Sequence, residues 1–306
     1  NLNDYYDVKL KESRLEEIEE FISKKNIEHE YQFIKLDLYN QKTLKNLFEE
    51  NEFDVVVNLA AQAGVRYSLV NPNAYIESNL VGFSNILECC RYNKIKHLIF
   101  ASSSSVYGLN TKQPFSTLDK TDYPISLYAA TKKSNELLAY SYSHLYEIPT
   151  TGLRFFTVYG PNGRPDMAYF KFVESILNNK SISLFNEGNM ERDFTYIDDV
   201  TSSLIQLIDR APKPQIIEST NSHAPFRLFN IGNNNPISLS KFIEAIEKAL
   251  GKKAKKDLLP MQPGDVESTF AEIDELYDEI GFKPTTSIEK GIEKFVEWYL
   301  ENQIKN

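Results

Sequence analysis

Apolar residues in the first half of the chain follow two different spacings. In 9–26 and 41–51 they recur at helical spacing among charged residues, which predicts surface helices. In 31–36, 54–61 and 97–101 they form short, nearly continuous runs, which is typical of strands buried on both faces. Helices and buried strands therefore follow one another along the chain.

The same pattern continues to about residue 157. We expect two long helices at 72–92 and 126–146 and a further strand at 150–156. Pro72 suits the first turn of its helix, where its missing N–H costs nothing. This succession predicts an α/β fold, a doubly wound, Rossmann-like parallel sheet with helices on both faces. Such sheets bind ligands at the carboxyl ends of their strands.

The chain changes character past residue 158, where elements become shorter and Gly, Pro and Asn more frequent. We expect 1–157 to form the sheet domain and 158–306 to form mainly a smaller C-terminal lobe. A helix beginning near Tyr196 and a strand at 226–231 are expected to return to the sheet, so that about 195–231 belongs with the first domain.

A tyrosine and a lysine lie one helical turn apart in the predicted helix 126–146. Tyr128 and Lys132 share a helix face, so the phenol and the ammonium can meet. A free tyrosine has a pKa of about 10, and a neighbouring cation favours the phenolate and makes it a better base. Serines at 102–105, after a predicted strand, could hold the oxygen whose proton the tyrosine removes. This trio predicts the oxidation of an alcohol beside a hydride acceptor, whereas the Tyr–Lys spacing alone is common by chance and would favour simple packing.

Composition restricts the partners more than the fold. The 306 residues include 34 Lys and Arg against 43 Asp and Glu, and the net charge of -9 argues against nucleic acid. No apolar run approaches the roughly 20 residues that span a bilayer and no signal peptide is visible, so we expect no membrane partner. Adjacent Cys89 and Cys90 indicate buried thiols in a reducing compartment, and we expect a cytoplasmic protein. The histidines show no metal-ligand spacing, so no metal site is expected: His29, His97, His144 and His223.

Five motifs in order give the chain a resemblance that covers nearly all its length. They are NLAA at 58–61, SSSSVYG at 102–108, Tyr128 with Lys132, RFFTVYGP at 154–161 and RDFTYIDDV at 192–200. With them the chain resembles the extended short-chain dehydrogenase/reductase family of nucleotide-sugar epimerases and dehydratases. NLNDYYD at 1–7 and QAGVRYS at 62–68 are similar to one branch, the UDP-glucuronate 4-epimerases.

The resemblance implies a tightly held NAD, a UDP-sugar substrate and often a homodimer built on the two long helices. It makes 1–157 a dinucleotide-binding domain and 158–306 mainly a substrate-binding lobe. The family opens with a strand, a Gly-rich turn and a ribose-binding acid, and no G-x-x-G-x-x-G occurs here. We expect roughly 30 preceding residues, one strand–helix unit, to be missing. A chain that truly began here should bind NAD poorly and leave a sheet edge uncovered.

The implied reaction is 4-epimerisation of a UDP-uronic acid through a transient 4-keto sugar. Tyr128 would take the C4 hydroxyl proton, Ser103 would hydrogen-bond the C4 oxygen, and Lys132 would lower the pKa of Tyr128 and bind the nicotinamide ribose. Ser104 and Ser105 stand where dehydratases and decarboxylases of the family place an acid, which disfavours those reactions.

Arginines are rare, eight against twenty-six lysines, so each one is informative. Guanidinium groups bind phosphate and carboxylate in a fork that lysine cannot copy. We expect Arg192 to meet the uridine diphosphate, and Arg66 and Arg164 to grip a sugar carboxylate unless they form surface ion pairs. Arg154, inside a strand, should be structural. The expected substrate contacts are Arg66, Ser104, Ser105, Thr157, Arg164, Arg192 and Asp265.

The resemblance also assigns the cofactor contacts. Asp37 should accept from the adenine amino group and Leu38 should pack on the ring, while Asn79 should hydrogen-bond backbone near the nicotinamide. Asp37 would otherwise be a helix N-cap or turn acid, and Asp265 an ordinary turn residue. The expected cofactor contacts are Asp37, Leu38, Leu59, Ala60, Ala61, Asn79 and Lys132.

The leading interpretation is thus a UDP-glucuronate 4-epimerase. One rival is another NAD-dependent 4-epimerase, acting on a UDP-N-acetylhexosamine or its uronate, which the two arginines for a bare carboxylate disfavour. The other rival is a non-catalytic NAD- or sugar-nucleotide-binding protein on the same scaffold. A protein that only binds has no need of the proton-transfer trio Ser103, Tyr128 and Lys132.

Overall fold

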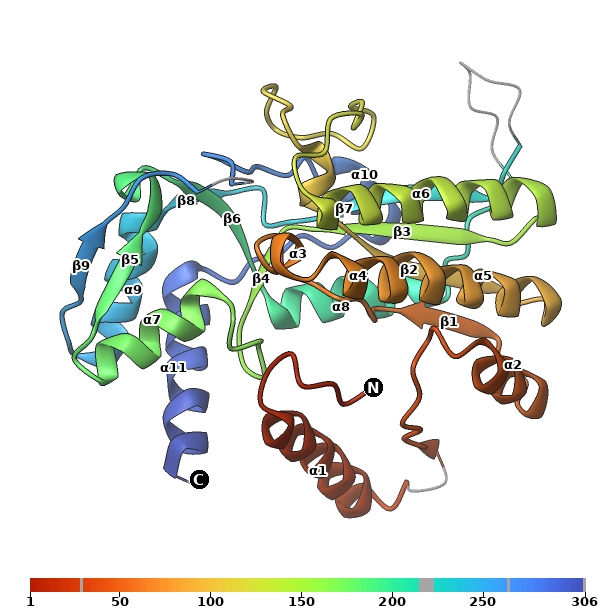
Figure 1. Ribbon diagram of the computed structural model, residues 1–306, viewed down its shortest axis with the longest axis horizontal. Coiled ribbons are helices and arrows are strands. Elements are labelled where there is room, and N and C mark those ends of the chain that lie inside the picture. The colour runs from red at the N-terminus through yellow and green to blue at the C-terminus, as the bar shows by residue number, and fades with distance from the viewer. Residues whose placement is uncertain (28–29, 215–222, 263–264, 305–306) are drawn as a thin grey trace.

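The computed structural model describes residues 1–306 except 28–29, 215–222, 263–264 and 305–306. At its centre lies a four-stranded sheet in which every pairing is parallel (Figure 1). In spatial order its strands are β1 (Val55–Asn58), β2 (His97–Ser103), β3 (Thr150–Phe155) and β7 (Phe226–Ile231). The predicted α/β fold with a Rossmann-like parallel sheet is confirmed, and the strand expected at 226–231 is β7.

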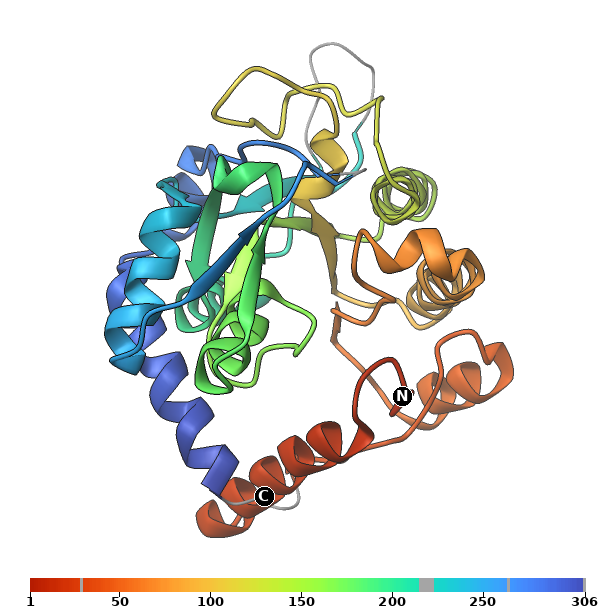
Figure 2. The same cartoon turned by 60° about the vertical axis from the view of Figure 1, so that its left-hand side comes forward.

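Helices cover both faces of this sheet (Figures 1 and 2). Strand β2 shows why, because successive side chains of a strand point to opposite faces. Leu98 and Phe100 pack into the core on one face, Ile99 packs into the core on the other, and all three are fully buried. The first face is covered by α2 (Gln41–Glu50), α5 (Gly82–Tyr92) and α6 (Leu127–Tyr146), and the second by α8 (Ile197–Ile208) and α10 (Asp274–Ile280).

The single helix predicted at 72–92 has a more complex form. It runs from α4 (Pro72–Tyr75) through a π-helical segment, η2 (Ile76–Val81), into α5. Asn71 caps its start by accepting the backbone N–H of the residue three further on, at 3.3 Å. π-Helical segments occur mostly as local insertions in helices, often at functional sites.

The strand predicted at 31–36 is wrong, because the described residues of this segment form no strand. A strand exists only by pairing, and the one neighbour of β1 in the described sheet is β2. Leu36 packs instead against the core beside α2 and α5, while Phe33 and Ile34 are exposed. The strand predicted at 54–61 is present but ends at Asn58, so residues 59–61 follow it as a loop.

A second group of elements builds the lobe to the left of the sheet in Figure 1. Its core is aromatic, and Phe194 stacks on Phe242 with ring centroids 4.2 Å apart. Its strands are β4 (Thr157–Tyr159), β6 (Glu191–Tyr196) and β8 (Pro236–Ser238) in one sheet, and β5 (Ser181–Leu184) with β9 (Lys255–Leu258) in another. Its helices are α7 (Ala168–Leu177), α9 (Leu239–Leu250) and α11 (Ile288–Ile304).

Helix α1 (Val8–Lys25) lies apart from the main sheet, at the bottom of Figures 1 and 2. Asp7 caps its start by accepting the N–H of Lys9 at 2.9 Å, and Asn26 ends it in the left-handed conformation. Among the described residues there are also three short helices: α3 (Tyr67–Val70), η3 (Ser104–Tyr107) and η4 (Phe185–Gly188). Within the described ranges, no helix has the length and apolar character needed to cross a membrane.

Candidate active site

A cleft of about 1610 Å³ opens at the carboxyl ends of the sheet strands. This is the edge at which parallel sheets bind ligands. Pockets for one small molecule usually measure about 300–1,000 Å³, so this cleft has room for two ligands side by side. Its walls come from the loops after β1 and β2, the start of α6, the lobe and the segment that contains α1.

The predicted trio lies together in the wall of this cleft. Ser126 caps the start of α6 and accepts the N–H of the residue three further on at 3.1 Å. This cap places Tyr128 in the first turn of α6 and Lys132 one turn later. Ser103 is the last residue of β2, so the parallel sheet brings its hydroxyl to the same edge.

Burial changes the proton affinities of this group. It raises the pKa of Tyr128, while the Ser103 hydroxyl and the Arg164 guanidinium lower it. Burial also lowers the pKa of Lys132 to about 8, and the charge of Glu136 opposes that change. Ser103 and Arg164 are thus two groups that favour the phenolate, and the lowering of the Tyr128 pKa by Lys132 stays a prediction. A shared helix face brings two side chains to one cleft without setting the distance between their end groups.

One end of the cleft suits a dinucleotide. Asp37 and Leu38 line it, and the Asp37 carboxylate accepts a hydrogen bond from the side-chain amide of Asn1. Leu38 is held in place because its carbonyl accepts from Asn85 of α5 at 2.9 Å. The exposed, mostly small side chains Leu59, Ala60 and Ala61 line the path from there towards Lys132. An acceptor for an amino group, an apolar platform, small wall residues and a cation together fit NAD.

Asn79 lies behind this wall and is not among the residues that line the cleft. Its side chain accepts the backbone N–H of Gln62 at 2.8 Å and donates to the Gln62 carbonyl at 3.0 Å. The same amide donates to the Thr131 hydroxyl of α6 at 3.0 Å. The expected backbone hydrogen bond is present, and both polar atoms of the Asn79 amide have protein partners, while its place among the cofactor contacts stays a prediction.

Three charged side chains converge at the other end of the cleft. Arg66 Nη2 lies 2.9 Å from Asp265 Oδ2, and the Arg66 guanidinium stacks over the Phe185 ring at 4.5 Å. Arg192 donates to the Glu191 carbonyl at 2.7 Å. Burial lowers the pKa of Arg192, and Arg66 acts in the same direction, whereas Asp265 raises it. Arg66 thus forms the ion pair considered as its alternative role, but that pair lines the cleft.

Arg164 enters the cleft from the loop after β4, together with the predicted substrate contacts Ser104, Ser105 and Thr157. Its Nε lies 3.5 Å from Asp166 Oδ1. Asp166 also accepts the hydroxyl of Tyr5 at 3.0 Å, and sequence reasoning missed this acid. The signal in the sequence that could have identified Asp166 is its position two residues after Arg164.

Helix α1 lies at the surface as predicted, with Ile22 its one buried residue, and one of its faces borders the cleft. Lys11 and Arg14 line the cleft. Arg14 donates to the Gly163 carbonyl at 2.7 Å and to the Tyr6 hydroxyl at 3.1 Å. One arginine in a helix otherwise rich in Lys and Glu was the signal for this contact. His29, Pro263 and Gly264 lie outside the described residues.

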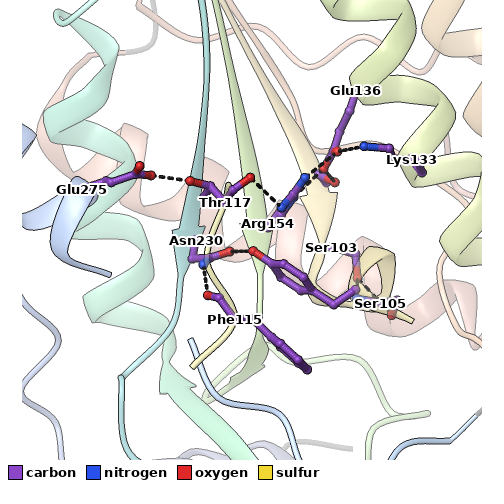
Figure 3. Close-up of polar contacts among 11 residues, drawn as sticks. Ser103, Ser105, Phe115, Thr117, Lys133, Glu136, Arg154, Asn230 and Glu275 are labelled. Atoms are coloured by element: carbon purple, nitrogen blue, oxygen red, sulfur yellow. Dashed lines mark hydrogen bonds and ion pairs between the residues drawn. The ribbon is translucent and has the colours of Figure 1, made fainter. Parts of the chain in front are cut away.

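Arg154 is buried in β3, as a structural role requires (Figure 3). Its guanidinium forms a two-pronged ion pair with Glu136 of α6, Nε to Oε1 at 2.8 Å and Nη2 to Oε2 at 2.9 Å. The pair lies beside the strand end that carries Ser103.

Comparisons with known proteins agree with this geometry. The model of the NAD dependent epimerase/dehydratase family matches residues 9–219. Protein CapI of Staphylococcus aureus is 55% identical, over 98% of this chain and 90% of that protein. A probable UDP-glucuronate 4-epimerase of Rhizobium meliloti (strain 1021) is 48% identical, over 97% and 87%. A solved UDP-glucuronic acid 4-epimerase from Bacillus cereus, in complex with UDP-glucuronic acid and NAD, is 32% identical with a TM-score of 0.80, over 92% and 85%. The chain therefore belongs to the NAD dependent epimerase/dehydratase family, and it is an epimerase with NAD as its cofactor.

Proposed function

We propose that this epimerase interconverts UDP-glucuronate and UDP-galacturonate. One observation carries the proposal: Arg164 lines the same cleft as Tyr128, and its charge lowers the pKa of the phenol. In a hexuronate the carboxylate is attached to C5, next to the C4 carbon on which Tyr128 acts. A guanidinium beside the base is thus placed for a sugar whose C6 is anionic.

The residues of the trio divide the proton chemistry. Tyr128 takes the proton of the C4 hydroxyl, and Ser103 hydrogen-bonds the C4 oxygen as it becomes a carbonyl. NAD, when bound, supplies a reversible hydride acceptor. The 4-keto sugar turns in the cleft, and Tyr128 returns the proton when C4 is reduced on its other face. The Lys132 ammonium supplies positive charge at the same site.

The side chains beside Ser103 favour this reaction over its relatives. Ser104 and Ser105 line the cleft and carry hydroxyls, which do no carboxylate acid–base work at neutral pH. Dehydration and decarboxylation would each use such an acid. Arg66, expected at the sugar carboxylate, lies instead beside Asp265 and Arg192, so we assign Arg66 and Arg192 to the diphosphate and Asp265 as the acceptor beside them.

Arg164 and Thr157 also have a protective role in this proposal. Oxidation of C4 in a uronate creates a β-keto acid, which tends to lose carbon dioxide. Loss requires the bond to the carboxyl carbon to align with the carbonyl π system. A carboxylate gripped by Arg164 and Thr157 keeps that bond out of alignment, so that the intermediate is reduced before it decarboxylates.

Tyr128→Phe tests the assignment most directly. We expect turnover to be abolished while binding of UDP-glucuronate, measured by calorimetry, is largely retained. Activity within about threefold of wild type would contradict the assigned base. Assays of the wild-type enzyme with UDP-glucuronate and with UDP-N-acetylglucosamine decide between the two substrates. A protein that binds the UDP-sugar without inverting C4 would be a sensor.

We further propose a homodimer built on α5 and α6, which lie side by side in Figures 1 and 2. Tyr92, Leu137 and Leu145 are 69%, 58% and 65% exposed on these helices, and a second copy would cover them. Light scattering measures the assembly. The adjacent free thiols Cys89 and Cys90 support a cytoplasmic location.

A further inference from the structure

A buried carboxylate lies one helical turn beyond Lys132 on α6. Glu136 is 3% exposed, and its two oxygens receive four hydrogen bonds, of which the one from Lys133 to Oε2 is the longest at 3.5 Å. Ser102 donates to Oε1 at 2.6 Å, and Arg154 donates to Oε1 and Oε2 at 2.8 and 2.9 Å. Figure 3 shows Arg154 reaching from its strand to Glu136. The carboxylate is thus fully engaged and does not line the cleft.

The three shorter hydrogen bonds to Glu136 come from two neighbouring strands. Ser102 of β2 and Arg154 of β3 are paired in register, at the carboxyl end of the sheet. Ser103, the proposed ligand of the C4 oxygen, is the next residue of β2. One carboxylate on α6 therefore fastens the helix that carries Tyr128 and Lys132 to the strand end that carries Ser103.

Arg154 is itself held from the opposite side. Its guanidinium lies over the Tyr107 ring at 4.9 Å, and its Nη1 donates to the Thr117 carbonyl at 3.5 Å. The Tyr107 hydroxyl donates to Asn230 of β7 at 2.6 Å. The Thr117 hydroxyl donates to Glu275 of α10 (Figure 3). The network runs from α6 across the sheet to β7 and α10, so Glu136 cannot shift independently of the sheet.

Glu136 is connected to the cleft by its charge as well as by its position. Burial lowers the pKa of Lys132 to about 8, and the Glu136 carboxylate counteracts this by favouring the ammonium. The charged and titratable groups that face Glu136 and the trio are Tyr75 of α4, Tyr107 of η3, Tyr128, Lys132 and Lys133 of α6, Arg154 of β3, and Arg164 of the loop after β4.

We propose that Glu136 is a positioning residue of the active site, which fixes α6 to the end of β2 and balances the charge of Lys132. The inference rests on the proposed catalytic roles of Tyr128 and Lys132. A buried ion pair is seldom the most stable solution, because well-packed apolar residues of similar volume often serve as well or better. A pair buried directly behind the trio therefore has a reason beyond stability.

Glu136→Gln is the central experiment. Lys132 works as the ammonium, and activity is lost as pH rises through its pKa. Removal of the Glu136 charge lowers that pKa, so we expect the alkaline limb of the kcat/KM profile to move to lower pH by roughly one unit. NMR of 13C-labelled lysine, with the Lys132 signal identified by its absence in Lys132→Met, measures the same shift without turnover.

Two further variants separate positioning from folding. The double variant Glu136→Gln with Arg154→Gln leaves no unpaired buried charge. It replaces the single variant if Glu136→Gln fails to fold. Its alkaline limb should still lie at lower pH than that of wild type. Glu136→Asp keeps the negative charge but shortens the side chain that joins α6 to the strands. We expect its alkaline limb at the wild-type pH and its kcat below that of wild type. As a matched control, Glu279→Gln breaks the Arg227–Glu279 pair, 2.9 Å, whose partners do not line the cleft, and should leave the limb in place.

The outcomes distinguish this inference from the function on which it rests. If Tyr128→Phe is inactive but both Glu136→Gln variants keep the wild-type limb and Lys132 titration, Glu136 has no positioning role. If Tyr128→Phe remains active, the proposed function fails first. A shifted limb together with a matching shift of the Lys132 signal supports the inference.

Discussion

Two ion pairs of nearly equal length lie near the active site, one buried behind the trio and the other in the lining of the cleft. Arg154 and Glu136 are 2.8 Å apart with side chains only 2% and 3% exposed. Arg66 and Asp265 are 2.9 Å apart, with side chains 50% and 17% exposed. The bond chemistry is the same in both pairs, and the difference is access to water.

That difference assigns the pairs opposite tasks. A buried charge left without its partner is costly, so Glu136 and Arg154 stay together and hold α6 against the sheet. An exposed pair contributes about 0–1 kcal/mol, so it can exchange partners at little cost. Arg66 can leave Asp265 for a phosphate or carboxylate when a ligand enters. The same kind of ion pair, between an arginine and a carboxylate, is therefore rigid where it is buried behind the trio and adjustable where it is exposed to water at the substrate end.

The largest effect should follow from breaking the buried pair. Arg154→Met leaves the Glu136 carboxylate buried without its partner, and we expect a loss of about 3–5 kcal/mol in the free energy of unfolding. Urea denaturation measures it. The double variant Arg154→Met with Glu136→Leu should recover most of that loss, and a single-variant loss under about 1 kcal/mol would contradict the contrast with exposed pairs.

Breaking the exposed pair should affect binding far more than folding. Arg66→Met removes one guanidinium from the nucleotide end, and we expect affinity for UDP-sugar to fall about tenfold to a hundredfold. The free energy of unfolding should change by less than about 1 kcal/mol. Calorimetry and urea denaturation give the two values. Arg91→Met removes an arginine paired with Glu88 outside the cleft and is the control, which should bind normally.

Arg164 sharpens the comparison at the sugar end. Arg164→Ala should raise the yield of UDP-pentose relative to epimer severalfold, because the freed carboxylate can align for loss of carbon dioxide. Chromatography of the products with UDP-glucuronate measures the ratio. The Arg91→Met control should keep the wild-type ratio, and an unchanged ratio in Arg164→Ala would argue against the protective grip.

His97 extends the comparison to a buried group that must stay neutral. Its Nδ1 donates to the Ile208 carbonyl at 3.0 Å, and its Nε2 lies 2.9 Å from the Thr151 hydroxyl. Burial lowers the pKa of His97, with a smaller contribution from Arg227. The unfolded chain then binds more protons below about pH 6.5, so the stability that neutral His97 contributes is present above that pH and lost as pH falls.

The expected size of this acid effect is up to roughly 0.8 kcal/mol at pH 6 relative to high pH. It appears as a loss of unfolding free energy in wild type between pH 7 and 6. His97→Gln is less stable but has no ring to protonate, so its loss over the same interval should be smaller. Equal slopes in the two proteins would show that His97 does not titrate in this way.

Local patterns in the sequence were sufficient for most of the fold. The continuous apolar run that became β2 required cover on both faces, and the strands alternated with helices, which together predict a parallel sheet. Ser103, Tyr128 and Lys132 were found because strand ends and helix faces are set by position along the chain. Lining of the cleft by Asp37, Arg66, Arg164 and Arg192 was expected on the same grounds.

Other features depended on neighbours distant in the sequence. The apolar run 31–36 has strand composition, yet it forms no strand because pairing requires a partner that composition does not specify. Asn79 was expected to hydrogen-bond backbone, but its two partners, Gln62 and Thr131, are set by packing that the local pattern does not specify. Lys11 and Arg14 turned out to line the cleft because of where α1 lies, which its amphipathic pattern does not state.

The sequence by itself determined the sheet, its order of elements and the chemical groups at the strand ends, since periodicity and hydrogen-bonding needs act over a few residues. Tertiary structure alone decided which charges meet. It set Glu136 against Arg154 in the dry interior and Arg66 against Asp265 in the cleft, and it placed Arg164 where its charge lowers the pKa of Tyr128. Electrostatic effects depend on distance and access to water, and both are fixed only when the chain has folded.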